Sequence, residues 1–145
     1  MVLAVVPFGP ERFAFFASER IVVYPNCIDP GMFDPSRFSA DQLASLRAQF
    51  GFAVDDIVAT FVGTFGQWHG VDVLAQAVRR LIDEDREFLD RHRLRFLLVG
   101  DGLKMNQVKQ FLAGAEQGPY VRLAGLVPQT EAPKYPAASD VLLSP

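Results

Sequence analysis

The fold is decided by the stretch IVATFVGTFGQWHG at residues 57–70, together with the residues that follow it. Ile57–Val62 is apolar almost throughout, as expected of a strand whose two faces are both covered by helices. The next eight residues contain three glycines, a composition typical of a loop. From Val71 to Ile82, apolar residues recur at helical spacing on one face. The stretch therefore predicts a buried strand, a glycine-rich turn and an amphipathic helix.

The same alternation of strand and helix extends in both directions from this stretch. Further strands are predicted at Ile21–Tyr24, Leu94–Val99, Tyr120–Ala124 and Asp140–Leu143, and helices at residues 39–51, 104–114 and, as a short piece, 130–138. Ser39 and Gln42 have the spacing of a capping box, which marks the start of the first helix. The alternation predicts an α/β fold, a parallel sheet with helices on both faces and right-handed crossovers.

Two segments are harder to interpret. Residues 79–95 are rich in charge and are predicted to form a helix end and a charged loop. Residues 1–19 show no clear pattern, although VLAVV at residues 2–6 suits a strand. We therefore divide the chain into an uncertain segment, 1–19, and one domain, 20–145.

Composition narrows the class of protein. The chain has 145 residues, of which 50% are hydrophobic and 21% charged. This length suits one globular domain, and this composition excludes a chain that is disordered throughout. A net charge of −3 argues against a general nucleic-acid binder. The single cysteine, Cys27, excludes an internal disulfide and fits a reducing compartment. We see neither an apolar run long enough to span a membrane nor a signal peptide, and expect a cytoplasmic protein.

Glycines follow three of the predicted strands, where an open parallel sheet binds its ligands. They are Gly63, Gly66 and Gly70 after the first of these strands, Gly100 and Gly102 after the second, and Gly125 after the third. The helix that starts near Gly70 would direct its free amides at the first loop, which suits a phosphate. The spacing G-x-x-G-x-x-x-G is neither the dinucleotide fingerprint nor Walker A. Spacing alone leaves open a tight turn without a ligand.

Five segments, taken in order, resemble the motifs of the group 1 glycosyltransferases (glycosyltransferase family 4). They are YPNCIDPGMF at 24–33, FVGTF with WHGVDVL at 61–74, LLVGDG at 97–102, VRLAGLVP at 121–128 and AASDVLLSP at 137–145. The resemblance covers residues 20–145. It implies a GT-B enzyme, in which two Rossmann-like domains face one cleft. This chain resembles the first part of the C-terminal domain, an incomplete half of that fold.

The resemblance also implies a function. The parent protein would transfer a sugar from a nucleoside-diphosphate sugar to an acceptor, with retention of configuration, without a required metal ion and without a cofactor. Its partners would be the nucleotide sugar and an N-terminal acceptor domain that this segment lacks. The family's Glu-x7-Glu segment would begin after Pro145, so the catalytic residues are unknown here and this segment alone is expected to be inactive. A lipid acceptor would place the parent at a membrane face.

Roles can be carried over only to positions that match the motifs. The implied diphosphate-binding residues are Gly63, Thr64, Gly66, His69 and Gly70; the cleft-lining residues are Asn26, Gly100, Asp101, Gly102 and Lys104; and the nucleobase would meet the backbone of Leu126 and Val127. The family often has Arg and Lys where this chain has Thr64 and His69. This difference keeps open an alternative, a non-catalytic α/β module that binds a nucleotide or phosphate.

Several of these side chains also have a purely structural interpretation. Asp101 suits a turn that it caps itself. Lys104 suits a solvated helix position, and His69 a loop histidine packed by Trp68. The run Asp83-Glu84-Asp85 is interpreted as charged surface rather than a metal-binding D-x-D motif. Two separate histidines and one cysteine give no metal-site spacing, so no metal site is predicted.

Overall fold

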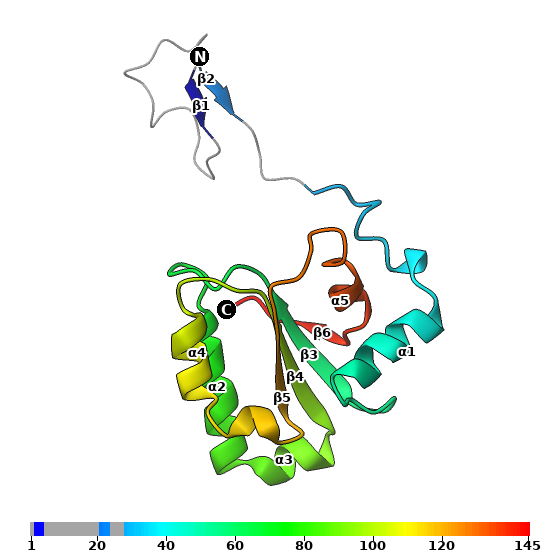
Figure 1. The fold of residues 1–145 in the computed structure, drawn as a ribbon, viewed down its shortest axis with the longest axis vertical. Coiled ribbons are helices and arrows are strands. Elements are labelled where there is room, and N and C mark those ends of the chain that lie inside the picture. Colours follow the sequence, from blue (N-terminus) through cyan, green and yellow to red (C-terminus); the bar gives the residue numbers. More distant parts are fainter. Residues whose placement is uncertain (1, 5–20, 24–27) are drawn as a thin grey trace. The chain divides into compact units, whose positions relative to one another are not determined.

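The computed structural model describes residues 2–4, 21–23 and 28–145, and the chain divides into two compact units, residues 1–32 and 33–145 (Figure 1). In the first unit, strand β1 (Val2–Ala4) pairs in parallel with β2 (Ile21–Val23). Of the strand predicted at Ile21–Tyr24, Ile21–Val23 is thus present and Tyr24 lies outside the described residues, but the prediction that this strand belongs to the main sheet is wrong. A short apolar run specifies a strand without specifying its neighbour.

The second unit contains a four-stranded parallel sheet in the order β5-β4-β3-β6. Its strands are β3 (Ile57–Val62), β4 (Leu94–Val99), β5 (Val121–Gly125) and β6 (Val141–Leu142). The chain advances from β3 to β5 on one side and then returns to place β6 on the other side of β3. The direction of winding therefore reverses at β3, and the carboxyl edge beside such a reversal is where open α/β sheets bind ligands.

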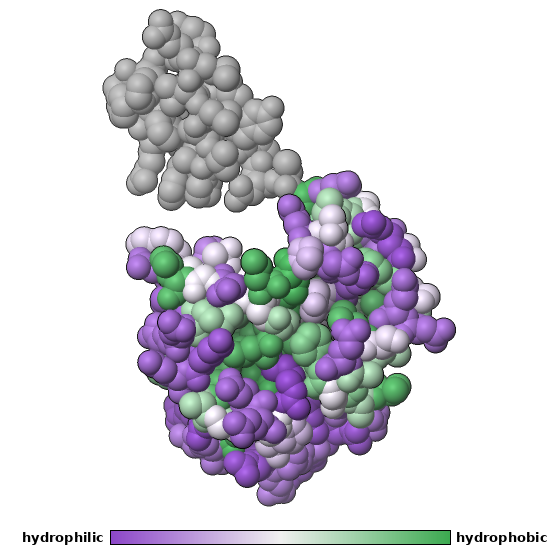
Figure 2. Space-filling view, viewed as in Figure 1, coloured by the Kyte–Doolittle hydropathy of each residue, from purple (hydrophilic) through white to green (hydrophobic). Residues whose placement is uncertain are grey.

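Helices cover both faces of this sheet, which confirms the α/β prediction. On one face α2 (Val71–Glu84) packs against α4 (Met105–Phe111), and on the other α1 (Ala40–Gln49) meets α5 (Lys134–Ala137) (Figure 1). Each face has its own apolar cluster, a large one under α2 and α4 and a smaller one around Phe52, Val58, Leu97 and Val99. Figure 2 shows hydrophobic side chains in the middle of one face with hydrophilic ones around them.

Local signals in the sequence explain where the helices begin. The predicted capping box of α1 is confirmed: Gln42 N donates to Ser39 Oγ at 3.3 Å and Ser39 N donates to Gln42 Oε1 at 2.9 Å. No side chain of α1 is fully buried, so this helix lies at the surface and covers its face of the sheet only in part. Two short 3-10 helices, Pro35–Arg37 and Ala115–Gln117, are not indicated by the sequence pattern.

The charged stretch is more regular than predicted. The expected loop contains α3 (Arg86–Arg91), whose first turn is capped by the Asp85 carboxylate, an acceptor for Phe88 N at 3.3 Å. Leu89 is completely buried and anchors this helix to the core. Two adjacent apolar residues among many charges, Phe88 and Leu89, are too weak a periodic signal to reveal a helix of this length.

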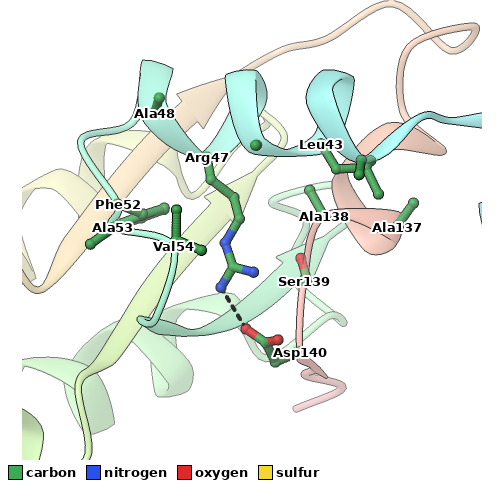
Figure 3. A pocket seen from close by; sticks show the side chains of 12 residues that line it. Leu43, Arg47, Ala48, Phe52, Ala53, Val54, Ala137, Ala138, Ser139 and Asp140 are labelled. Atoms are coloured by element: carbon green, nitrogen blue, oxygen red, sulfur yellow. Dashed lines mark hydrogen bonds and ion pairs between the residues drawn. The ribbon is translucent and has the colours of Figure 1, made fainter.

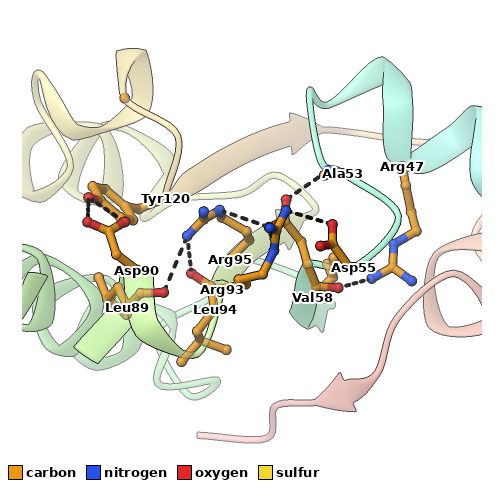
Figure 4. Close-up of polar contacts among 12 residues, drawn as sticks. Arg47, Ala53, Asp55, Val58, Leu89, Asp90, Arg93, Leu94, Arg95 and Tyr120 are labelled. Atoms are coloured by element: carbon orange, nitrogen blue, oxygen red, sulfur yellow. Dashed lines mark hydrogen bonds and ion pairs between the residues drawn. The ribbon is translucent and has the colours of Figure 1, made fainter. Parts of the chain in front are cut away.

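The amino edge of the sheet is held together by an internal polar network (Figure 4). Asp56, almost fully buried, lies 3.5 Å from both Arg93 and Arg95, and the Tyr120 hydroxyl donates to Asp90 at 2.9 Å. Burial, followed by the Asp90 hydrogen bond, raises the pKa of Tyr120 above its ordinary value. These polar groups are engaged with one another, so this edge of the sheet is a structural one. In the part of the chain that the structure describes, no helix has the length and hydropathy needed to cross a membrane.

Candidate functional site

The loops that follow β3 and β4 are joined by backbone hydrogen bonds at the carboxyl edge of the sheet. Gly63 N donates to Val99 O at 3.0 Å, and Phe65 N donates to Asp101 O at 2.9 Å. Lys104 N in turn donates to Phe65 O at 2.9 Å. The glycine-rich loop is therefore fixed against the next loop rather than standing free.

This close approach requires two of the glycines. Gly100 has φ +141°, and a methyl group added to it would lie 1.8 Å from the Gly63 carbonyl oxygen. Gly102 has φ +153°, and its methyl group would lie 2.8 Å from the Phe65 carbonyl oxygen. Both glycines, which the sequence assigned to a ligand cleft, also allow two backbone segments to pack together.

A cavity of about 440 Å³ opens between these loops and the one after β5. Six of the predicted site residues meet in its wall, namely Gly63, Thr64, Gly100, Asp101, Leu126 and Val127. A more open hollow adjoins it, lined by Thr64, Gly66, Asp101, Gly102, Leu103 and Asn106. Thr64 and Asp101 belong to both hollows, so the diphosphate and nucleobase regions expected from the resemblance lie next to each other.

Besides the strand-end residues Val62 and Val99, the sequence did not single out four residues of these walls: Gln129, Ala132, Leu103 and Asn106. Each lies a few positions beyond a strand end, a placement that could have marked it as a candidate. The rim is apolar, since Leu126 and Leu103 are 80% and 84% exposed. Trp68, in the glycine-rich loop, is 91% exposed.

Helix α2 begins at the end of the glycine-rich loop. Gly70, its N-cap, has φ +62° and provides no capping side chain. The first amides of a helix have no partner within the helix and form its positive end. A methyl group on Gly70 would lie 3.1 Å from the carbonyl carbon of Pro145, so the end of the segment after β6 also reaches this point.

His69 precedes Gly70 and is exposed, with its imidazole beside Gly66. A methyl group on Gly66 would lie 2.8 Å from His69 Nδ1. The structure does not support packing of His69 by Trp68, because Trp68 is itself almost fully exposed. His69 can therefore present a ring nitrogen to a ligand in this loop.

From the sequence, Asp101 and Lys104 received purely structural interpretations, and the structure supports only the one for Asp101. Asp101 Oδ1 accepts a hydrogen bond from Gly102 N at 2.7 Å, so its predicted turn-forming role is confirmed. The interpretation of Lys104 as a solvated lysine is wrong, because its Nζ lies 2.6 Å from Asp72 Oδ2 and both side chains are mostly buried. The hydrogen bond from Lys104 is the main cause of a lowered pKa at Asp72. Neither residue's sequence context predicts this pair.

Residues 56–145, well over half of the chain, match the family described as Glycosyl transferases group 1. The chain belongs to the group 1 glycosyltransferases. A curated relative, the 2-deoxystreptamine glucosyltransferase of Streptomyces kanamyceticus, is 30% identical over 131 residues, which are 89% of this chain and 32% of the relative. The chain thus spans about a third of the length of the curated relative that it matches.

Solved glycosyltransferase structures have the same fold. WaaG, a glycosyltransferase involved in lipopolysaccharide biosynthesis, superposes with a TM-score of 0.71 at 18% identity, over 99% of this chain and 37% of WaaG. HepE of Anabaena, solved in complex with UDP, gives a TM-score of 0.61 at 22% identity, over 90% of this chain and 33% of HepE. At these sequence identities the similarity shows the fold alone. That fold is an incomplete half of the GT-B architecture.

Three further features of this group 1 glycosyltransferase chain were considered from its sequence: Asn26 with Cys27, the acidic run at 83–85 and a metal site. Asn26 and Cys27 fall outside the described residues. Asp83 pairs with Arg79 at 2.7 Å and Glu84 with Arg80 at 2.8 Å, which confirms the interpretation of this run as charged surface. Among residues 28–145, no three His, Cys, Asp or Glu side chains come together as a metal site would require.

A second cavity, of about 390 Å³, lies between α1 and α5, away from the glycine loops (Figure 3). Its walls are mainly apolar, and Arg47 crosses it to reach Asp140 at 2.7 Å. Asp140 Oδ2 also accepts from Val58 N at 2.8 Å, which joins the starts of β3 and β6. The charges of Arg47 and Asp140 are therefore engaged in holding the fold together.

Proposed function

We propose that this chain forms the donor-binding part of a glycosyltransferase that takes a sugar from a nucleoside-diphosphate sugar. The observation that carries the proposal is the cavity at the carboxyl edge, where Gly63, Thr64 and Leu126 meet. Family membership favours a transferase over a non-catalytic module, and the binding of UDP by HepE, a protein of the same fold, supports a nucleoside diphosphate as the ligand.

The proposed chemistry assigns the leaving group to the glycine-rich loop. The bond between the anomeric carbon and the diphosphate oxygen breaks, and the acceptor oxygen bonds to that carbon and releases its proton. Negative charge then accumulates on the diphosphate, which the amides around Gly66 and Gly70 would stabilise together with Thr64 and His69. The backbone at Leu126 and Val127 would hold the nucleobase. Asp101 and Lys104 would shape the cleft wall.

Two finer features rest on the family resemblance alone. We propose that the configuration of the sugar is retained and that no metal ion is required. For the whole protein, NMR of the first-formed product would show the donor's anomeric configuration, and excess EDTA would leave the rate unchanged. An inverted product or loss of activity with EDTA would contradict these features.

The chain carries its own probe for the proposed site. Trp68 is the only tryptophan in the sequence and lies in the glycine-rich loop. We expect its fluorescence to change saturably on titration with UDP or GDP, and much less with uridine, because the diphosphate would bind beside it. If neither nucleotide gives saturable binding by fluorescence and calorimetry, the chain does not bind the proposed donor.

Thr64 allows this site to be tested without disturbing the glycines. Thr64 is exposed and lines both hollows. We expect Thr64→Glu to weaken UDP binding by about 2 kcal/mol, roughly 30-fold, because a carboxylate would face the diphosphate. Gln110→Glu, an equal change in charge on the exposed surface of α4, is the matched control. Equal UDP affinity of the two variants would place the diphosphate elsewhere.

His69 tests whether a cation at this loop strengthens binding. We expect His69→Lys to tighten UDP binding by about 1 kcal/mol, the upper range of an exposed ion pair. The gain should shrink in 1 M salt, which screens exposed charges. His92→Lys is the control, because His92 is also exposed but lies just before β4, at the opposite edge of the sheet. There its ring packs on Phe88. A similar gain in both variants would reflect net charge and not this site.

A further inference from the structure

The first turn of α2 contains a carboxylate where a diphosphate is proposed to bind. Asp72 is the second residue of this helix, two positions after the uncapped Gly70. A carboxylate there interacts favourably with the positive end of the helix. By the same electrostatics, an uncompensated carboxylate would repel an approaching anion and cancel the attraction of the amides.

Lys104 provides the compensation from a different part of the chain. Its Nζ lies 2.6 Å from Asp72 Oδ2, and the two side chains are only 20% and 15% exposed. The other carboxylate oxygen, Oδ1, is buried and has no hydrogen-bond partner among the described residues. Lys104 is therefore the principal partner of Asp72, and its removal would leave a mostly buried charge with only the positive end of the helix to offset it.

The position of Lys104 links this ion pair to the cavity wall. Lys104 N donates to Phe65 O at 2.9 Å, which fixes its backbone to the glycine-rich loop. Leu103, the preceding residue, lines the open hollow beside Thr64. The segment that forms the wall thus carries the ammonium group that neutralises the start of α2.

We propose that Lys104 is a positioning residue that neutralises Asp72 and so keeps the start of α2 able to attract the donor's diphosphate. The proposal rests on the proposed function. It differs from a direct role for Lys104 as a phosphate ligand, because Lys104 acts through Asp72. Once Asp72 is uncharged, Lys104 is no longer required for nucleotide affinity.

Four variants of the 145-residue chain test this: Lys104→Met, Lys104→Arg, Asp72→Asn and the double variant Asp72→Asn/Lys104→Met. Calorimetry gives their affinities for UDP and for uridine, and circular dichroism confirms that each is folded. We expect Lys104→Met to weaken UDP binding at least tenfold while uridine binding changes less than twofold. Lys104→Arg, Asp72→Asn and the double variant should bind UDP within about threefold of wild type. A merely structural role would change both ligands alike.

Contrary results separate the two proposals. If wild type binds UDP and Lys104→Met binds it equally well, or the double variant stays as weak as Lys104→Met, the proposed role of Lys104 is wrong. If wild type does not bind UDP, the proposed function fails and this inference fails with it. Should Lys104→Met not fold, Asp72→Asn and the double variant still decide. Equal UDP affinity of those two supports action through Asp72, and a weaker double variant shows direct contact.

Discussion

Gly100→Ala is expected to prevent the second unit from folding stably. The added methyl group would lie 1.8 Å from the Gly63 carbonyl oxygen, and the two atoms nearest to it belong to the Gly63 backbone rather than to a movable side chain. Gly100 also has φ +141°, a conformation that residues with a Cβ rarely adopt. To accommodate the methyl group, the loops after β3 and β4 would have to separate and give up the hydrogen bonds that join them.

The expected loss is more than about 4 kcal/mol of unfolding free energy, which is a large share of the stability of an ordinary domain. Gly114→Ala is the matched control. Gly114 also has positive φ, +79°, but nothing lies within 4 Å of its added methyl group. It should lose only about 1–2 kcal/mol, the cost of a left-handed conformation.

Urea unfolding followed by circular dichroism would measure both variants. Similar small losses for Gly100→Ala and Gly114→Ala would show that the two loops can separate without cost. In that case close packing of the two loops would not be the reason for a glycine at position 100.

The strands and their loops could be predicted because their signals are local. Ile57–Val62 and Leu94–Val99 are largely apolar runs, each followed by a glycine, and both form strands at the predicted bounds. The cavity could be anticipated because parallel strands end at one edge and the motifs sit at those ends. What local patterns do not contain is pairing across the chain. Ile21–Val23 forms a strand, but nothing in its sequence says that its neighbour is Val2–Ala4.

The same limit explains the misinterpretation of Lys104. A lysine at the start of a helix is usually solvated. Its pairing with Asp72 depends on α2 and α4 lying side by side on one face of the sheet, a tertiary fact. The role of Asp101 was easier to predict, because the hydrogen bond that it accepts comes from its immediate neighbour, Gly102. The turn at Asp101 is therefore predictable from its own sequence, and the pairing of Lys104 with Asp72 is not.

Phe65 is the side chain expected to hold the glycine-rich loop in place. It is completely buried in the larger apolar cluster, and its ring centroid lies 6.0 Å from that of Phe61. Its backbone N and O are both bonded to the loop after β4. The side chain and backbone of one residue thus connect the core to the proposed phosphate loop.

Phe65→Ala is expected to lower the unfolding free energy by about 3–5 kcal/mol, since it leaves a cavity the size of a phenyl ring. Trp68→Ala, in the same loop but 91% exposed, should change it by less than about 0.5 kcal/mol. Urea unfolding followed by circular dichroism measures both without relying on tryptophan fluorescence. UDP affinity of folded Phe65→Leu should also fall, because a smaller anchor lets the loop move away from the ligand. Equal stability of the alanine variants would show that backbone hydrogen bonds alone position this loop.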